Sequence, residues 1–151
     1  MARNPEAIPR VAESEPLVEL LDSFDPRFQE HITAAMLWRL GLASPGDEAD
    51  RALVRSLEHI LVATGGELHR FFHDAFASAL PDSYCEAWTE FRALAAAHPP
   101  RKERGAYWDG EPCGMLIDEV EAIWAPVADN DDWSLLHAKV AEVRALGEAL
   151  A

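Results

Sequence analysis

The sequence predicts an all-α protein, a single domain of about six to seven helices. Apolar residues recur at intervals of three and four through most of the 151 residues, which is the spacing of one helix face. Glycines and prolines divide these stretches into lengths that suit helices. No segment alternates polar and apolar residues between turn residues, as a half-buried strand would.

The charge balance excludes two classes of partner. The sequence has 27 acidic and 13 basic residues, so its formal net charge is −14. Such a charge repels nucleic acid and anionic membrane surfaces. Arg101, Lys102 and Arg104 lie close together, but binding to a phosphate backbone normally needs more contacts, so we interpret them as a solvated loop. We therefore expect no nucleic-acid partner and no membrane partner.

Other bulk features predict a soluble cytoplasmic protein. The 151 residues, 49% of them hydrophobic, suffice for one domain that needs no disulfide or metal. No apolar run approaches the roughly 20 residues of a membrane span. The segment Met1–Arg10 lacks the apolar centre of a secretory signal. Cys85 and Cys113 lack CxxC spacing, so we expect both to be reduced and structural.

The N-terminal part of the chain is expected to begin with an extended arm, which is followed by two helices. Residues 1–14 contain two prolines and no apolar periodicity, which predicts an extended arm. The helical domain is expected to cover residues 15–151, and its first, short helix starts after a possible cap at Ser14. Asp25 and Pro26 suit the start of a second helix, as a capping carboxylate and a residue whose φ is already helical.

Three further helices follow in the middle of the chain. Gly41 is placed to end the second helix, because glycine readily takes the positive φ of a C-terminal cap. A third helix is expected over residues 47–64, before a pair of glycines. Apolar residues at helical spacing predict two more helices, over residues 67–80 and 84–97, and prolines follow each of them.

Residues 98–112 form the longest irregular stretch, at a length where loops are often functional or disordered. Two large aromatic residues, Tyr107 and Trp108, lie in it. We expect them to dock back on the helices as packing anchors, with a ligand platform as the alternative.

Two amphipathic helices are expected at the C-terminal end. The first begins after Cys113 and is expected to end at Pro126. The second begins after a cap from Asp131 or Asp132 and runs to Leu150. An isolated amphipathic pair cannot cover its own apolar stripes, so we expect both stripes to bury and to close the core.

One pair of histidines could bind a metal. His69 and His73 are four residues apart on a predicted helix, so their rings share a face, with Glu67 nearby. A third ligand could come from His31 or His59 if the fold brought them close. The glutamate of a HEXXH protease motif is absent between them. The alternative is a partly exposed polar face without a metal.

No catalytic residue and no cofactor-binding residue is predicted. The sequence contains no GxxxxGK[ST] or GxGxxG loop for phosphate and no GxSxG around a nucleophilic serine. The carboxylates between residues 118 and 132 lack the ligand spacing of an EF-hand loop. We interpret them as a solvated face, whose first-turn acids complement a helix dipole.

Several motifs resemble the C-terminal helical region of the SelO (YdiU-type) family of protein adenylyltransferases. They occur in the family's order and together span most of the chain from about Leu17 onward. The motifs are FDPRF at residues 24–28, MLWRLGL at 36–42, FFHDAF at 71–76 and EPCGMLIDEVEAIWAPVADNDDWSLLHAKVAE at 111–142.

The resemblance implies a helical region that accompanies a kinase-like core. That core transfers AMP from ATP to protein hydroxyl groups with a divalent metal, and its nucleotide- and metal-binding segments have no counterpart in these residues. ATP and the metal are therefore implied for the core alone. We expect a non-catalytic accessory or interaction domain that packs against such a core or another protein.

Two other functions are left open by the sequence. One is a small metal-binding or hydrolytic helical protein that uses His69 and His73. The other is a self-associating module, a homo-oligomer, because the apolar stripes could exceed what one domain buries.

Overall fold

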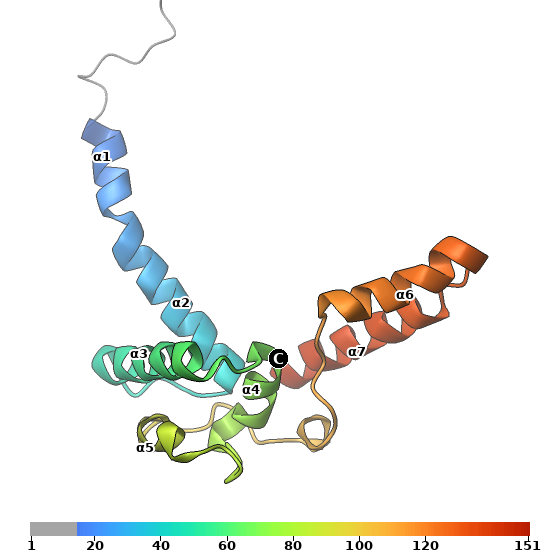
Figure 1. Cartoon of the computed structure of the whole chain (residues 1–151). Coiled ribbons are helices and arrows are strands. Elements are labelled where there is room, and N and C mark those ends of the chain that lie inside the picture. Colours follow the sequence, from blue (N-terminus) through green and yellow to red (C-terminus); the bar gives the residue numbers. More distant parts are fainter. Residues whose placement is uncertain (1–14) are drawn as a thin grey trace, which may run out of the picture. The chain divides into compact units, whose positions relative to one another are not determined.

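The computed structural model describes residues 15–151, and the arm predicted for residues 1–14 lies outside them. The described residues form seven α-helices and three short 3-10 helices, with no strand beyond an isolated bridge between Leu42 and Pro100. The all-α prediction is therefore confirmed. The elements, labelled as in Figure 1, are α1 (Glu15–Asp22), α2 (Phe24–Leu40), α3 (Asp47–Thr64), α4 (Leu68–Asp74), η3 (Phe76–Ser78), η4 (Glu86–Trp88), α5 (Thr89–Ala96), η5 (Ala106–Asp109), α6 (Ile117–Asn130) and α7 (Ser134–Leu150).

Contacts divide the chain into two units, Met1–Ala35 and Met36–Ala151. The described part of the first unit holds α1 and most of α2, which are separated by Ser23 alone. The rings of Phe24 and Phe28 stack there with centroids 5.6 Å apart. The second unit contains the hydrophobic core and the candidate functional site. No helix between residues 15 and 151 is long and apolar enough to cross a membrane.

The core of the second unit lies where the end of α2 meets α3, α4 and α5. Phe71 is 1% exposed, and its ring stacks on Trp88 with centroids 4.9 Å apart and meets Phe91 edge-on at 5.4 Å. Such aromatic pairs stabilise a core beyond the area they bury. The buried residues of this core are Leu37, Leu40, Leu42, Leu53, Leu57, Ile60, Phe71, Phe72, Ala75, Trp88, Phe91 and Ala95.

Gly41 ends α2 as predicted, with a φ of +65° that glycine adopts without strain. The structure adds a second requirement for glycine, because a Cβ here would lie 2.5 Å from Cε2 of Phe76. The Ala43 N–H then donates to the Pro99 carbonyl, and the Arg101 N–H to the Gly41 carbonyl, both at 2.8 Å. These bonds fasten the segment after α2 to the segment after α5.

A buried ionic contact also joins α3 to the segment after α5. Asp50 is 5% exposed and His98 is 2% exposed. Nε2 of His98 lies 3.1 Å from Oδ1 of Asp50, and Nδ1 lies 2.9 Å from the Leu94 carbonyl oxygen. Each ring nitrogen of His98 therefore lies within hydrogen-bond distance of an oxygen atom. Oδ2 of Asp50 accepts a hydrogen bond from the Ser44 hydroxyl at 2.5 Å.

The helix predicted over residues 67–80 is shorter than expected, because α4 is followed by a turn through η3. Ala77 and Ser78 take positive φ angles of 56° and 62° there. Phe76 is fully buried, and its ring stacks on Trp108 with centroids 3.7 Å apart. Long-range packing of Phe76 thus overrides the local preference for a helix.

The helix predicted over residues 84–97 begins later than expected, as η4 followed by α5. The guanidinium group of Arg92 donates to the carbonyl oxygens of Pro81 at 2.6 Å and Tyr84 at 2.9 Å. These bonds hold the preceding turn against α5, so its carbonyls are not used in a longer helix.

Pro126 lies inside α6, and the prediction that it ends this helix is wrong. An interior proline removes one donor and its ring crowds the carbonyl four residues earlier, but its φ is helical, and α6 continues past it to Asn130. The end comes at Asp131, which has a φ of 53° and whose N–H donates to the Val127 carbonyl at 3.1 Å. The N-cap position of α7 is Trp133, so the prediction that Asp131 or Asp132 would occupy it is wrong by one residue. Oδ1 of Asp132 still accepts the Ser134 N–H, at 2.9 Å.

The C-terminal helices do not close the core, contrary to the prediction. Instead α6 and α7 lie side by side as an antiparallel hairpin (Figure 1). The last turns of α7 pack on η5, where Leu150 joins Phe76 and Trp108 in a small cluster. Because α2 to α5 already bury their apolar faces against one another, much of the hairpin stays uncovered within the second unit. Val120 and Trp124 are 39% and 60% exposed.

The loop over residues 98–112 docks on the helices through its aromatic residues. Trp108 is 3% exposed and packs with Phe76 and Leu150, and Tyr107 lies at the edge of the same cluster. The interpretation of these aromatic residues as packing anchors is therefore confirmed.

Candidate functional site

The two histidines predicted as metal ligands lie one turn apart on α4. His73 is 6% exposed, and its Nδ1 lies 3.3 Å from Oδ1 of Asp74. His69 is partly exposed, and its Nε2 lies 3.8 Å from Oε2 of Glu67. Each ring therefore has a different carboxylate beside it.

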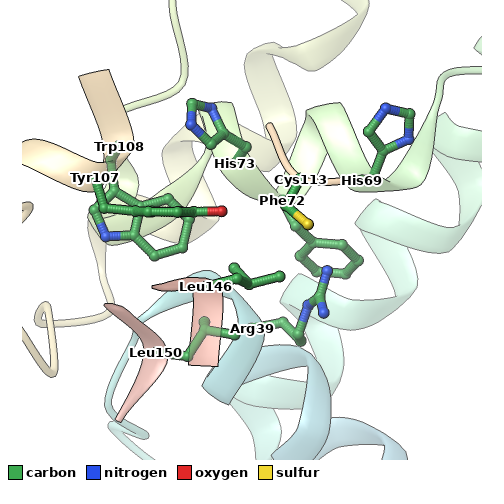
Figure 2. Close-up of a pocket in the computed structure, with 9 residues that line it drawn as sticks. All are labelled: Arg39, His69, Phe72, His73, Tyr107, Trp108, Cys113, Leu146 and Leu150. Atoms are coloured by element: carbon green, nitrogen blue, oxygen red, sulfur yellow. The ribbon is translucent and has the colours of Figure 1, made fainter. Parts of the chain in front are cut away.

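Both histidines border a small cavity between α4, η5 and the end of α7 (Figure 2). The Tyr107 hydroxyl points into this space, near the thiol of Cys113. The cavity volume is about 10 Å³, which gives room for about one water molecule. A space of this size does not admit a nucleotide.

A metal would need a third ligand beside His69 and His73. His59 is exposed on α3, and His31 belongs to the first unit. Across the described residues, no group of three or more His, Cys, Asp or Glu side chains is placed to hold a metal ion. Metal binding by the two histidines stays a prediction, which metal analysis of the purified chain tests.

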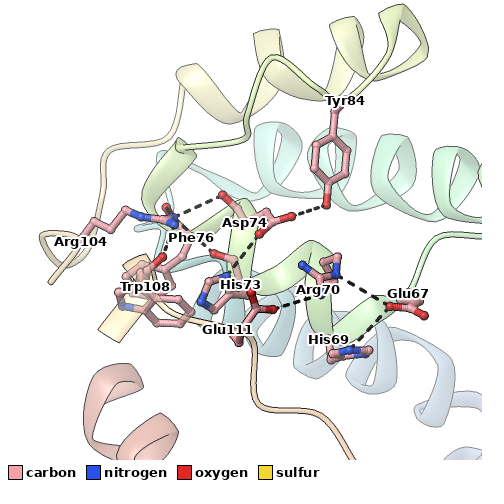
Figure 3. A network of polar contacts seen from close by, with 10 residues as sticks. All are labelled: Glu67, His69, Arg70, His73, Asp74, Phe76, Tyr84, Arg104, Trp108 and Glu111. Atoms are coloured by element: carbon pink, nitrogen blue, oxygen red, sulfur yellow. Dashed lines mark hydrogen bonds and ion pairs between the residues drawn. The ribbon is translucent and has the colours of Figure 1, made fainter. Parts of the chain in front are cut away.

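A polar network surrounds the C-terminal end of α4 (Figure 3). At its centre, the guanidinium group of Arg104 donates to four carbonyl oxygens, and a cation at the last carbonyls of a helix complements its dipole. The Tyr84 hydroxyl donates to Oδ2 of Asp74 at 2.9 Å. The network thus holds α4, η3 and η5 together. The four carbonyls belong to His73 at 3.3 Å, Asp74 at 3.3 Å, Phe76 at 3.4 Å and Trp108 at 2.6 Å.

The other basic residues of this loop bind the end of α7. Arg101 donates to the Leu150 carbonyl at 2.6 Å, and Lys102 donates to the Glu148 carbonyl at 3.3 Å. All three cations therefore meet carbonyl groups at helix C-termini. Their interpretation as a solvated loop is wrong for Arg104, whose side chain is half-buried. Their clustering alone gave no signal of which helix ends they would reach.

The network predicts a loss of stability at high pH. Burial, together with the hydrogen bond and charge of Asp74, raises the pKa of Tyr84 to about 12. An unfolded tyrosine ionises near pH 10, so the folded state keeps a proton that the unfolded state loses. The contribution of Tyr84 is present below pH 10 and lost as the pH rises toward 12. Denaturant unfolding measured at several pH values across this window gives the free energy of unfolding. This free energy should fall less steeply with pH for Tyr84→Phe than for the unchanged chain. An identical fall would contradict the assignment.

The two cysteines are expected to differ in reactivity. Cys85 is exposed, whereas burial raises the pKa of the Cys113 thiol above its ordinary value. The thiolate is the reacting species. Cys113 should therefore react with a disulfide reagent at neutral pH at least about tenfold more slowly than Cys85. Cys85→Ser should remove the fast phase and leave the slow one. Two equally fast thiols would show that the cavity beside Cys113 opens readily.

The α6–α7 hairpin is held together by a buried lysine. Lys139 is 7% exposed, and its ammonium group bonds the carboxylates of Glu119 and Glu142 and, at 3.3 Å, the Gly114 carbonyl. Burial lowers the pKa of Lys139, but the hydrogen bonds and charges of the two glutamates outweigh burial and raise it above its ordinary value. The lysine is thus charged and paired inside the hairpin.

The ion pair between Lys139 and Glu119 defines how the two helices are rotated toward each other. The next residues, Val140 and Val120, are each turned by about 100° from the pair. Because the helices are antiparallel, these equal rotations lead to the same side of the hairpin. That side, the hairpin face, is defined by Ile117, Val120, Trp124, Val140 and Val143, which are 68%, 39%, 60%, 38% and 43% exposed.

The hairpin face is the feature of the second unit that most needs a partner. Apolar side chains from both helices gather on one side, and contiguous exposed patches of this kind usually mark interaction sites. The stripes were predicted from the sequence, but their exposure was not, because the prediction assigned them to the core.

Comparison with known proteins gives a distant relative. The chain is 29% identical over 143 residues to the protein nucleotidyltransferase YdiU of Gloeobacter violaceus. The match covers 80% of this chain and 29% of that protein, so the chain spans less than a third of the relative's length. No protein-family model matches the chain, and no solved structure matches it. The match supports a distant relationship to the YdiU/SelO family.

Proposed function

We propose that this chain is a non-catalytic helical domain that accompanies the catalytic part of a YdiU-like protein nucleotidyltransferase. The observation that carries the proposal is the match itself, which takes in most of this chain and a minor part of the relative. In this proposal the matching part is the C-terminal helical region, and nucleotide transfer to protein belongs to the remainder. The domain would then act in the cytoplasm with its enzyme.

Two features of the second unit support an accessory role. The cavity beside His69 and His73 has a volume of about 10 Å³, whereas small-molecule sites usually enclose about 300 Å³ or more, so the space beside these two histidines is too small for such a site. The hairpin face exposes the large apolar side chain of Trp124, which a protein partner would cover. A domain whose helices leave an apolar face open is suited to packing against another domain.

The direct test is calorimetry of the purified chain with ATP and magnesium, followed by an assay for AMP transfer to protein. A YdiU protein that contains its catalytic part is the positive control. We expect neither binding nor transfer by this chain alone. Micromolar ATP binding or labelling of a target protein would contradict the proposal.

The metal-binding or hydrolytic alternative has its own test. Stoichiometric zinc or another divalent metal that survives purification, and is lost in the His69→Ala/His73→Ala variant, would favour it. Equal metal content in the double variant would instead assign the metal elsewhere.

A further inference from the structure

We propose that the hairpin face packs against the hairpin face of a second copy of this chain, and that the two hairpins together form an antiparallel four-helix bundle. This dimer goes beyond the proposed function, which leaves open the protein that covers this face. It forms whether or not the chain also accompanies a catalytic part.

The carboxylates on the outer sides of the hairpin do not oppose such a pairing. Successive residues of a helix are turned by about 100°, so Asp118 and Asp129 of α6 point away from Val120. Glu142 of α7 points away from Val140 in the same way. Like charges that meet at an interface disfavour the complex, but these three carboxylates stay on the far sides of the two hairpins.

Two exposed charges of opposite sign, Glu121 on α6 and Arg144 on α7, lie at opposite edges of the hairpin. Counted at about 100° per residue from the Glu119–Lys139 pair, each of them points outward, away from the neighbouring helix. Glu121 precedes Asp132, in the turn of the hairpin, by 11 residues, and Arg144 follows it by 12. Residues equally far from the turn lie side by side on antiparallel helices. The two charges therefore lie at nearly the same height.

A two-fold rotation about the long axis of the hairpin makes these two edges complementary. It places α6 of the second copy over α7 of the first, so that Glu121 of each copy meets Arg144 of the other. Opposite charges thus meet twice in one symmetric contact, which favours this pairing. A two-fold axis across the helices would instead stack each helix on its own copy, and the two charges would stay on different helix pairs.

The apolar centre of the face fits the same rotation. Trp124 and Val140 each lie eight residues from Asp132, so Trp124 of each copy covers Val140 of the other. These side chains are 60% and 38% exposed in the single chain. A large aromatic anchor that packs at the centre of the contact is typical of protein interfaces.

The size of the face predicts a weak, reversible dimer. α6 has 14 residues, which gives a length of about 21 Å, and two helices side by side are about 22 Å wide. Two such faces bury roughly 900 Å² in all, which is less than most stable interfaces bury. We therefore expect a dissociation constant in the micromolar range or above. At lower concentrations the chain is a monomer with Trp124 exposed, and the stability of the single chain is measured there.

Sedimentation equilibrium of the full chain over a range of concentrations tests the dimer. We expect a reversible species of twice 16.7 kDa. Val120→Ser/Val140→Ser should weaken the dimer at least about tenfold, because it removes apolar area from the centre of the face. The matched control is Leu135→Ser, which removes an α7 side chain that is 48% exposed and lies off the face. This control should dimerise as tightly as the unchanged chain.

A charge exchange tests the symmetry. Glu121→Lys and Arg144→Glu should each weaken their own dimer about tenfold, because each variant places like charges at both edges. An equal mixture of the two variants should associate nearly as tightly as the unchanged chain, since each edge of the mixed dimer again joins opposite charges. A purely structural role of either residue within its own chain would give no such rescue.

Three results would overturn the proposal. They are a chain that stays monomeric at every concentration, a dimer that Leu135→Ser weakens as much as the double serine variant does, and a mixture that associates no more tightly than either charge variant alone. ATP binding or AMP transfer by the chain would refute the proposed function and leave the dimer standing.

Discussion

Replacing Asp50 with alanine is expected to lower the free energy of unfolding by about 3–5 kcal/mol, the usual effect of removing one partner of a buried ion pair. The buried ring of His98, 2% exposed, would lose the carboxyl group whose Oδ1 lies 3.1 Å from its Nε2. The Ser44 hydroxyl would lose its acceptor as well. A domain of this size is typically stable by about 5–15 kcal/mol, so the variant should lose a large share of its stability.

Urea unfolding followed by circular dichroism measures this effect. Asp47→Ala is the matched control, because Asp47 lies in the same first turn of α3 but pairs with Arg51 on the surface, at 4.0 Å. An exposed pair of this kind contributes about 0–1 kcal/mol. If both variants lose the same small amount, the buried contact between Asp50 and His98 does not hold α3 to the segment after α5.

Trp108→Ala is expected to destabilise the chain by about 3–5 kcal/mol, the range for removing a large aromatic residue from a core. The indole is 3% exposed and stacks on Phe76, with centroids 3.7 Å apart and planes 10° from parallel. Its removal would open a cavity where the loop over residues 98–112 meets η3 and α7. The carbonyl of residue 108 would also be less well placed for Arg104.

The matched control is the tryptophan of the hairpin face. Trp124 is 60% exposed, so Trp124→Ala should change the free energy of unfolding by less than about 1 kcal/mol. Thermal unfolding of the two variants side by side makes the comparison. A larger loss for Trp124→Ala than for Trp108→Ala would show that the hairpin packs against the core in solution, and it would also remove the basis for a free hairpin face.

Local signals in the sequence were sufficient for the helical class and for several helix ends. Gly41 and Gly65 take φ angles of 65° and 63° where glycine was predicted to end a helix. Oδ1 of Asp132, one residue before the N-cap of α7, accepts the Ser134 N–H. These features depend on residues close together in the chain, so propensity and spacing predict them.

Two other boundaries were mispredicted, one because a distant residue decides it and one because a local signal was given too much weight. α4 ends early where Phe76 turns to stack on Trp108, and α6 continues past Pro126 until Asp131 takes a left-handed conformation. Helix propensity alone predicts neither boundary. Tertiary contacts override it at the end of α4, and in α6 the effect of one proline is too small to end the helix.

The sequence alone determined an acidic, all-helical chain with amphipathic C-terminal helices and two histidines on one helix face. The tertiary structure alone decided which apolar stripe became core and which stayed exposed, and it paired Asp50 with His98, which lie 48 residues apart. Periodicity shows that a helix has an apolar face but does not name the surface that covers it. That choice depends on how the helices compete for the same buried space, and here α2 to α5 filled the core and left the hairpin face open.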